Sequence, residues 1–257
     1  MFFGGHLENK MKAIKAIFGY HSVISALAHT PKHVVCIYLQ NKKQDDHSQE
    51  ILSLAQAHNV PVKYLSRDRL GEMVYHANHQ GIVAEVTRTS DYTEDDLQKI
   101  LDGVDAPLLL ILDGVQDPHN LGACLRTANA AGVHAVIAPR DRACGLTPTV
   151  YKVASGAVET TPFIQVTNLA RTMRMLKEFN IWIYGTAEEA DQDIYHVDLK
   201  GPVALVLGAE GEGLRRLTRE HCDFLVKIPM SGVVPSLNVS VATGVCLFEA
   251  VRQRVQI

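Results

Sequence analysis

The sequence predicts an α/β protein in two parts, a larger carboxy-terminal part built on a parallel sheet and a smaller amino-terminal α/β part. From residue 107 onward, unbroken apolar runs alternate with helical patterns, which is typical of parallel strands that helices cover on both faces. An acidic, polar stretch at 91–106, in which one helix is expected, separates these runs from an earlier set of strand and helix patterns. With 257 residues, of which 47% are hydrophobic, the chain is long enough to form both parts.

The amino-terminal part is predicted over residues 13–90. Its elements are expected in this order: a helix in "GYHSVISALAH", a strand in "HVVCIYL", a polar helix near 46–58, a strand in "VPVKYL", a short helix after Ser66 and a strand in "GIVAEV". This part is the more basic one, because residues 1–90 contain ten Lys and Arg against seven Asp and Glu, whereas the whole chain has a net charge of -3. Residues 1–12 match no element and are interpreted as a tail of unknown role.

The carboxy-terminal part is predicted over residues 107–257, after a linker at 91–106. Strands are expected at 108–113, 134–138, 181–185, 203–207 and 224–228. Helices are expected near 120–131, 148–157, 168–179, 213–221 and 237–252. In parallel sheets, ligands bind beyond the carboxyl ends of the strands, so polar residues that directly follow a strand are the candidates for a functional site.

Composition narrows the class of protein. The longest apolar runs, such as "PLLLIL" and "VALVLG", are much shorter than the ~20 residues that a membrane-spanning helix needs, and "MFFGGHLENK" has no signal-peptide pattern. A cytoplasmic protein without a membrane partner is therefore expected. The cysteines form no C-x-x-C pair and no zinc-site spacing with histidine, so we expect buried thiols and neither disulfides nor a metal site.

The first candidate segment, "DGVQDPHNLGACLRTANAAG", follows the strand at 108–113. Its small residues predict a helix that packs closely against another backbone segment. Arg126 is exceptional in this small, apolar helix, and burial of its stem by its neighbours would suit the guanidinium for binding a phosphate or a carboxylate. In the alternative interpretation, Asn120 only caps the helix and Arg126 is an exposed surface residue.

The second candidate segment is "VALVLGAEGEGL". Gly208, Gly211 and Gly213 permit positive φ angles and a close approach of a ligand to backbone N–H groups. The order G-x-x-G-x-G differs from the dinucleotide fingerprint, no G-x-x-x-x-G-K-[ST] motif occurs, and Glu210 would repel a diphosphate. A cationic or neutral ligand is therefore favoured. The alternative is a plain glycine turn in which Glu210 and Glu212 begin the next helix.

The third candidate segment, "IPMSGVVPSLNVSVATGVCLFEAVRQ", combines a strand end, a polar interruption and an apolar helix. Ser236 and Asn238 supply hydroxyl and amide groups that either cap this helix or contact a ligand. Val241, Val245 and Phe248 share one stripe of the helix. A second helix could pack closely on the small residues Ala242, Gly244 and Ala250, which indicates a subunit interface. The segment is thus a candidate for both ligand binding and dimer formation.

Together the three segments resemble those of the SPOUT methyltransferases, in the TrmH/SpoU branch. The segments "NLGACLRTA", "LGAEGEGL" and "IPMSGVVPSLNVSVATGVCLFEAVRQ" carry the resemblance, and "FGYHSVISAL" and "NHQGIVAEV" resemble the L30e-like amino-terminal domain of its RlmB-type members. The resemblance implies a deep trefoil knot in the carboxy-terminal domain and a homodimer formed through the last helix. It implies transfer of a methyl group from S-adenosylmethionine to the ribose 2'-hydroxyl of a guanosine in the peptidyl-tRNA-binding loop, or P loop, of 23S ribosomal RNA.

The resemblance also assigns roles to residues. The catalytic set that it implies consists of Asn120, Arg126 and Glu210. The residues that it places around the cofactor are Gly208, Ile228, Ser236, Leu237 and Asn238. It assigns RNA recognition to the amino-terminal domain, whose cationic residues include Lys32, Lys42, Lys43, Lys63, Arg67 and Arg69. Pro235 departs from the family pattern, which bears on the path of its loop.

Other functions stay open at this point. The same reaction could act on the ribose of a tRNA D-loop or on another rRNA site, because no residue encodes the target nucleotide. A protein that binds RNA or assists ribosome assembly without catalysis is a second alternative, against which the catalytic set argues. A nucleotide-dependent oxidoreductase is a third, but the sequence lacks its fingerprint.

Overall fold

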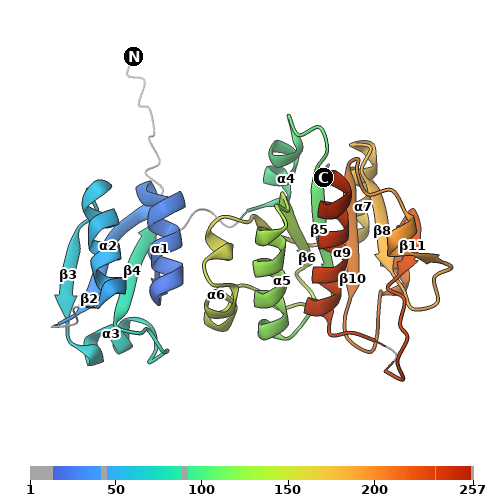
Figure 1. The fold of residues 1–257 in the computed structure, drawn as a ribbon. Coiled ribbons are helices and arrows are strands. Elements are labelled where there is room, and N and C mark those ends of the chain that lie inside the picture. Colours follow the sequence, from blue (N-terminus) through green and yellow to red (C-terminus); the bar gives the residue numbers. More distant parts are fainter. Residues whose placement is uncertain (1–13, 42–44, 88–91, 235, 256–257) are drawn as a thin grey trace, which may run out of the picture. The chain divides into compact units, whose positions relative to one another are not determined.

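The computed structural model describes residues 14–41, 45–87, 92–234 and 236–255 (Figure 1). The chain divides into two compact units, Met1–Ser90 and Asp91–Ile257. The predicted tail at 1–12, together with Lys42, Lys43 and Pro235, lies outside the described residues. No helix in the described parts of the chain is both long and apolar enough to span a membrane.

The first unit is a mixed four-stranded sheet with helices on both faces. In chain order its elements are β1 (Ile14–Phe18), α1 (Tyr20–His29), β2 (Val34–Gln40), α2 (Asp46–Ala57), β3 (Val62–Leu65), α3 (Arg67–Met73) and β4 (Ile82–Thr87). The strand order is β1-β4-β2-β3, and only β2 and β3 run parallel. Ile37 and Leu39 of β2 pack in the core beneath α1 and α2, whereas Tyr38 faces the smaller core around α3. The alternation follows from the pleat of the strand.

The second unit contains a seven-stranded sheet in which every pair of neighbours is parallel. Its strands are β5 (Leu108–Asp113), β6 (Ala135–Pro139), β7 (Phe163–Val166), β8 (Trp182–Thr186), β9 (Gln192–Asp193), β10 (Val203–Gly208) and β11 (Phe224–Lys227). The order is β7-β6-β5-β10-β8-β11-β9. The chain therefore adds β6 and β7 on one side of β5 and the later strands on its other side. The predicted parallel sheet is confirmed. Such a change of direction creates a crevice at the carboxyl ends of the strands.

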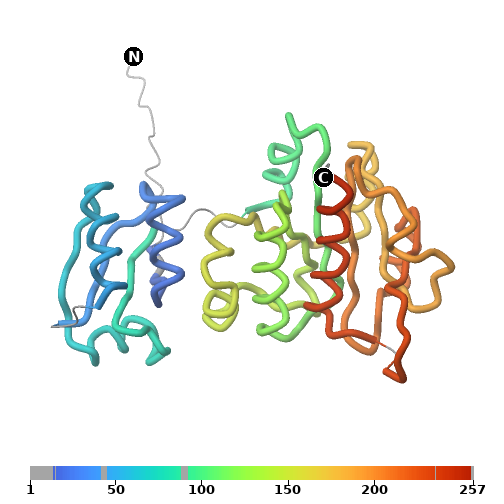
Figure 2. The backbone as a smooth tube through the Cα atoms, viewed as in Figure 1, coloured from blue at the N-terminus to red at the C-terminus, as the bar shows by residue number. Residues whose placement is uncertain are grey.

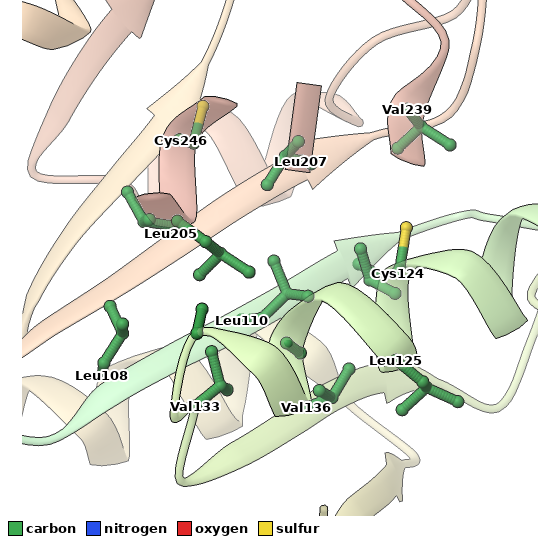
Figure 3. Packing of buried hydrophobic residues seen from close by; sticks show 14 of the residues in the cluster. Leu108, Leu110, Cys124, Leu125, Val133, Val136, Leu205, Leu207, Val239 and Cys246 are labelled. Carbon is green, nitrogen blue, oxygen red and sulfur yellow. The ribbon is translucent and has the colours of Figure 1, made fainter. Parts of the chain in front are cut away.

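Helices cover both faces of this sheet. They are α4 (Glu94–Leu101), α5 (Pro118–Ala130), α6 (Pro148–Ala154), α7 (Leu169–Glu178), α8 (Arg216–Glu220) and α9 (Val239–Arg254). On one face α5 and α9 lie side by side, as Figures 1 and 2 show, and their buried residues join Leu110 and Leu205 of the central strands (Figure 3). On the other face α4 and α7 pack over Leu109 and Ile111.

Local chemistry explains where the helices nearest the site begin. Pro118 occupies the first turn of α5, and the Asp117 carboxylate accepts a hydrogen bond from the His119 N–H at 2.9 Å. Asp117 is therefore the cap, and the interpretation of Asn120 as the cap is wrong. Asn238 does cap α9, because its side-chain oxygen accepts a hydrogen bond from the Ser240 N–H at 2.9 Å.

The sequence missed three short strands and misplaced one helix start. β1, β7 and β9 were not predicted, and they have two to five residues each. α8 begins at Arg216 instead of 213, so Glu210 and Glu212 do not begin a helix. Within the stretch expected as a linker, residues 94–101 form α4, whose Leu97 is fully buried in the second unit.

Candidate active site

A cavity of about 880 Å³ opens at the carboxyl ends of the central strands of the second unit. Thr186, Gly208 and Lys227 line it, and they end β8, β10 and β11. The remaining wall comes mainly from the loop after β8, the loop after β10 and the segment between β11 and α9. The last two belong to the second and third segments singled out in the sequence, which the fold brings to one edge of the sheet.

The residues expected around a cofactor gather at this cavity. Gly208, Ile228, Ser236 and Leu237 all line it. Asn238 follows Leu237 and caps α9 beside it. Apolar side chains of Leu207, Ile228, Leu237 and Val239 share the wall with glycines and carboxylates. The cavity therefore offers both a surface for a flat apolar group and exposed backbone for hydrogen bonds.

The loop after β10 owes its shape to glycine. Gly211 and Gly213 have φ angles of 78° and 66°, where other residues are strained. The Gly213 N–H donates a hydrogen bond to the Ala209 carbonyl at 2.9 Å, which closes the loop on itself. A Cβ at Gly208 would lie 2.1 Å from the Gly213 carbonyl carbon. Gly208 is thus required by the backbone of its own loop.

Asn120, Glu210 and Asn238 form one hydrogen-bonded cluster beside the cavity. The side-chain amide of Asn238 donates to the Asn120 side-chain oxygen at 2.9 Å and also to the Glu210 carboxylate. The Glu210 carboxylate further accepts a hydrogen bond from the Val239 N–H, at 3.2 Å, in the first turn of α9. A helix N-terminus favours a negative charge, so these contacts hold Glu210 in place. Two of the three predicted catalytic residues therefore meet.

Arg126 does not join this cluster. It is exposed on α5, outside the residues that line the cavity, and it forms no hydrogen bond or ion pair with the described part of the chain. The expectation that its neighbours bury its stem is wrong. The reason is its helical phase, because Leu121, Cys124, Leu125 and Ala128 turn α5 toward the sheet and leave Arg126 on the opposite side.

An ion pair that was not predicted from the sequence anchors the end of the glycine loop to β5. Asp113, the last residue of β5, is fully buried. Its carboxylate accepts hydrogen bonds from the Arg215 Nε at 2.6 Å and from the Arg215 backbone N–H at 3.0 Å, and it forms an ion pair with the same guanidinium. The pair joins β5 to the end of the loop that begins at Gly208. A polar residue that ends an apolar strand was the available signal.

The cavity is lined by more carboxylates than cations. The carboxylates that line it belong to Glu188, Glu189, Asp191, Asp193, Glu210 and Glu212. Arg219 and Lys227 are the cations, and Arg219 is paired with Glu189. The pKa of Glu189 is lowered by a hydrogen bond from its own backbone N–H and by Arg219, so this carboxylate stays ionised at neutral pH. The balance favours a ligand with positive charge.

Burial keeps two thiols of the second unit in their protonated form. Burial raises the pKa of Cys124 to about 11 and the pKa of Cys222 to about 12, so both are protonated at neutral pH. Cys36, Cys124 and Cys246 are buried as expected, whereas Cys144 and Cys222 are partly exposed. In the described parts of the chain, no group of three or more His, Cys, Asp or Glu side chains could hold a metal ion.

Comparison with known protein families assigns the two units. Residues 107–248 match the model of the SpoU rRNA Methylase family, and residues 16–92 match the model named RNA 2'-O ribose methyltransferase substrate binding. The chain belongs to the SpoU rRNA methylase family. The family match spans the cavity, the glycine loop and most of α9, and thus every predicted site residue.

Individual members of the SpoU family resemble the chain over most of its length. It is 57% identical over 238 residues to the 23S rRNA (guanosine-2'-O-)-methyltransferase RlmB of Pectobacterium atrosepticum, covering 93% of this chain and 98% of that protein. The same-named protein of Shewanella oneidensis is 55% identical over 95% of this chain and 99% of its own. The resemblance to the TrmH/SpoU branch is therefore confirmed.

A solved SpoU structure extends the likeness to the fold. The methyltransferase AviRb of Streptomyces viridochromogenes, in complex with its cofactor AdoMet, is 25% identical to the chain. It matches with a TM-score of 0.77 over 94% of this chain and 90% of its own. The α/β class and the two-part arrangement of SpoU methyltransferases thus hold for this chain.

Proposed function

We propose that this chain is a cytoplasmic enzyme that transfers a methyl group from S-adenosylmethionine to the ribose 2'-hydroxyl of a guanosine in 23S rRNA. The observation that carries the proposal is the placement of Gly208, Ile228 and Leu237 around one cavity, with Asn120 and Glu210 hydrogen-bonded at its edge through Asn238. The 57% identity to a 23S rRNA (guanosine-2'-O-)-methyltransferase supports the substrate. The P loop is the target region that we propose within that RNA.

The cavity fits S-adenosylmethionine in size, charge and surface. Its volume of about 880 Å³ lies within the range of cofactor sites. The excess of carboxylates suits a molecule with a sulfonium and an ammonium group, and Leu207, Ile228 and Leu237 offer an apolar surface for the adenine ring. When bound, this cofactor supplies an electrophilic methyl group on its sulfonium. Gly208 and its loop would hold it through backbone groups.

The protein's own task is to position the ribose and to remove its proton. Holding the 2'-oxygen in line with the methyl carbon can contribute roughly 7–11 kcal/mol, which makes positioning the largest effect. General-base assistance adds about 10²- to 10⁴-fold in rate. In this proposal Asn120 and Glu210 orient the nucleoside, because their cluster is fixed on the N-terminus of α9. Arg126 clamps the phosphate beside the target ribose and relays the proton.

A homodimer explains the position of Arg126. Val241 and Phe248 are 52% and 48% exposed on α9, and such an apolar stripe indicates a protein interface. α5 packs beside α9, and both helices turn their buried sides to the same face of the sheet. A second copy packed on this stripe would therefore lie next to Arg126. We propose that Arg126 of one chain serves the cavity of its partner.

The remaining features of the family are part of the proposal. The amino-terminal unit recognises the RNA, with Lys32, Lys63, Arg67 and Arg69 exposed on it. The tail of the second unit is threaded in a deep trefoil knot. The return of the chain from β11 to α9, which contacts β10 in the middle of the sheet, supports this threading.

The experiment is a map of 2'-O-methylated nucleotides in total RNA from cells with and without the gene. We expect one guanosine of 23S rRNA to lose its methyl group in the deletion strain and to regain it when the gene is restored. A gene carrying Asn120→Ala, which keeps the fold because the side chain is only half-buried and belongs to none of the apolar cores, should not restore it. Purified protein should bind S-adenosylmethionine in calorimetry.

Each alternative gives a different result. Loss of a tRNA mark would show that the substrate is wrong while the reaction is right. Loss of no mark, together with failure to bind S-adenosylmethionine, would leave an RNA-binding or assembly protein instead.

A further inference from the structure

A second cavity, of about 730 Å³, lies wholly within the first unit. It opens between the end of β2, the start of α3 and the loop at 75–81 that joins α3 to β4. The side chains that matter here are those of Gln40, Arg67, Asp68, His76, Asn78 and Gln80. The cavity is therefore polar, whereas the cores of this unit are apolar.

The loop at 75–81 has an unusual and well-held backbone. Tyr75, His76 and Gln80 have φ angles of 52°, 59° and 52°, a region that residues other than glycine rarely occupy. The His76 N–H donates to the Gly71 carbonyl at 2.7 Å, and the Tyr20 N–H donates to the Gln80 side chain at 3.3 Å. Strained conformations that the surroundings hold in place are typical of ligand-binding segments.

An exposed aromatic residue directly precedes the residues of the loop that line this cavity. Tyr75 is 91% exposed and directly precedes His76, the first residue of the loop that lines the cavity. A ring that gains almost no burial in the folded chain contributes little to stability, so its position in a strained turn calls for another role. Exposed aromatic rings beside polar grooves are the platforms on which unpaired bases stack.

The polar groups of the cavity match a nucleotide. The side-chain amides of Gln40 and Asn78 carry both donors and acceptors, as the edges of bases do. Arg67 forms no ion pair with the described residues, in contrast to Arg69, which pairs with Glu72 at 3.3 Å. A single available guanidinium beside Asp68 suits one backbone phosphate and disfavours a free di- or triphosphate.

We propose that this cavity and Tyr75 bind one unpaired nucleotide of the RNA substrate. The base stacks on the Tyr75 ring, the amides and imidazole contact its edge, and Arg67 contacts the adjoining phosphate. The identity of the ligand as RNA rests on the proposed function. The site shares Arg67 with the predicted RNA contacts and goes beyond them, since it adds one tyrosine and one preformed loop to a set of surface cations.

The test measures binding of the full-length protein to a protein-free 23S rRNA transcript and, separately, to total tRNA, by filter retention. Tyr75→Ala should weaken binding by about 5- to 150-fold, the range found when a stacked aromatic is removed. Tyr75→Phe keeps the ring and should bind within about twofold of wild type. Tyr64→Ala is the matched control, because Tyr64 is an exposed tyrosine of the same unit that lies on β3, outside the loop at 75–81.

A second variant tests the phosphate contact. Arg67→Gln should lower the slope of log affinity against log salt concentration by about 0.7–1, the value for one lost phosphate contact. Binding of S-adenosylmethionine should be unchanged in all four variants, because its cavity lies in the second unit. Urea denaturation, compared with that of the wild type, shows whether the first unit still folds. Both Tyr75 and Arg67 are exposed, so their replacement leaves the cores intact.

The results separate this inference from the proposed function. If Tyr75→Ala binds as well as Tyr64→Ala, the inference is overturned even when the wild-type protein methylates 23S rRNA. If the wild-type protein binds RNA but transfers no methyl group, the proposed function fails, and the Tyr75 comparison still decides the inference. If the wild-type protein binds neither RNA, the inference is overturned.

Discussion

A methyl group on Gly208 would overlap its own loop, because the ideal Cβ position lies 2.1 Å from the Gly213 carbonyl carbon and 2.5 Å from the Leu214 nitrogen. Gly208→Ala must therefore shift the backbone that lines the cavity. We expect the affinity for S-adenosylmethionine to fall by at least about tenfold and the free energy of unfolding to fall by about 1–3 kcal/mol, as for other overpacked sites. Calorimetry and urea denaturation measure the two effects.

Gly232 provides the matched control for this change. It lines the same cavity, and a Cβ built on it meets open space. Gly232→Ala should leave both the affinity and the stability close to wild type. Equal losses in the two variants would contradict the steric role given to Gly208.

The Asp113 carboxylate is a buried charge whose single cationic partner among the described residues is Arg215. Asp113→Asn preserves the shape but leaves the guanidinium without its counter-charge. We expect the free energy of unfolding to fall by about 2–4 kcal/mol, a little less than for a fully buried pair, because Arg215 is partly exposed. The loop from Gly208 to Arg215 would lose its anchor, so the KM for S-adenosylmethionine should rise more than kcat falls.

A surface pair on α8 controls for this prediction. Arg216 and Glu220 are paired at 2.8 Å, and both side chains are largely exposed. Glu220→Gln should change the free energy of unfolding by less than about 1 kcal/mol. A similar small change in Asp113→Asn would show that the buried pair does not anchor the loop.

Sequence and structure agree on single residues where the chemistry is local. The three glycines at 208, 211 and 213 are easily recognised in the sequence. They predict the turn because glycine adopts positive φ angles without strain. In the sequence Asp113 is only a polar residue at the end of a strand. Its ion pair could not be predicted, because the partner, Arg215, lies about a hundred positions away. The burial of the Arg126 stem was wrongly predicted, because small residues on all sides of α5 conceal which side of the helix faces the sheet.

At the scale of elements, the sequence predicts what depends on local pattern. The buried central strands were found because both faces of the sheet are covered, which leaves long apolar runs. β7 was missed because its four residues include Gln165, and β1 because it is a five-residue strand at the edge of its sheet. The position of β10 between β5 and β8 has no local signal, since strand order is set by packing of the whole sheet.

The exposed apolar stripe of α9 predicts a dimer that a single charged substitution on the stripe should dissociate. Phe248→Asp places a carboxylate in the proposed apolar interface, where desolvation without a partner is costly. We expect the wild-type protein to be a dimer in size-exclusion chromatography with light scattering, and the variant to be a monomer. Leu217→Asp on α8 is the control, because Leu217 is also exposed and apolar but lies outside the stripe. A monomeric wild type would contradict the proposed interface.

At the scale of the whole molecule, the two units have separate cores. A chain that lacks residues 1–90 should therefore fold and bind S-adenosylmethionine, since all residues of the candidate cofactor cavity lie in the second unit. It should not methylate 23S rRNA, because the unit proposed to recognise the RNA is missing. Calorimetry and incorporation of labelled methyl groups measure the two properties. Methylation at the full rate would contradict this division of roles.

The proposed dimer and the exposed position of Arg126 together predict that two inactive chains can restore activity. In a mixture of Arg126→Ala and Glu210→Gln chains, a heterodimer pairs the intact Glu210 cavity of one chain with the intact Arg126 of the other. Random mixing makes half of the dimers mixed, each with one complete site, so about a quarter of the wild-type activity should return. Activity is measured after the separate variants have been mixed, denatured and refolded together. If each cavity uses its own Arg126, every site in the mixture carries a defect, and the activity stays at the level of the separate variants.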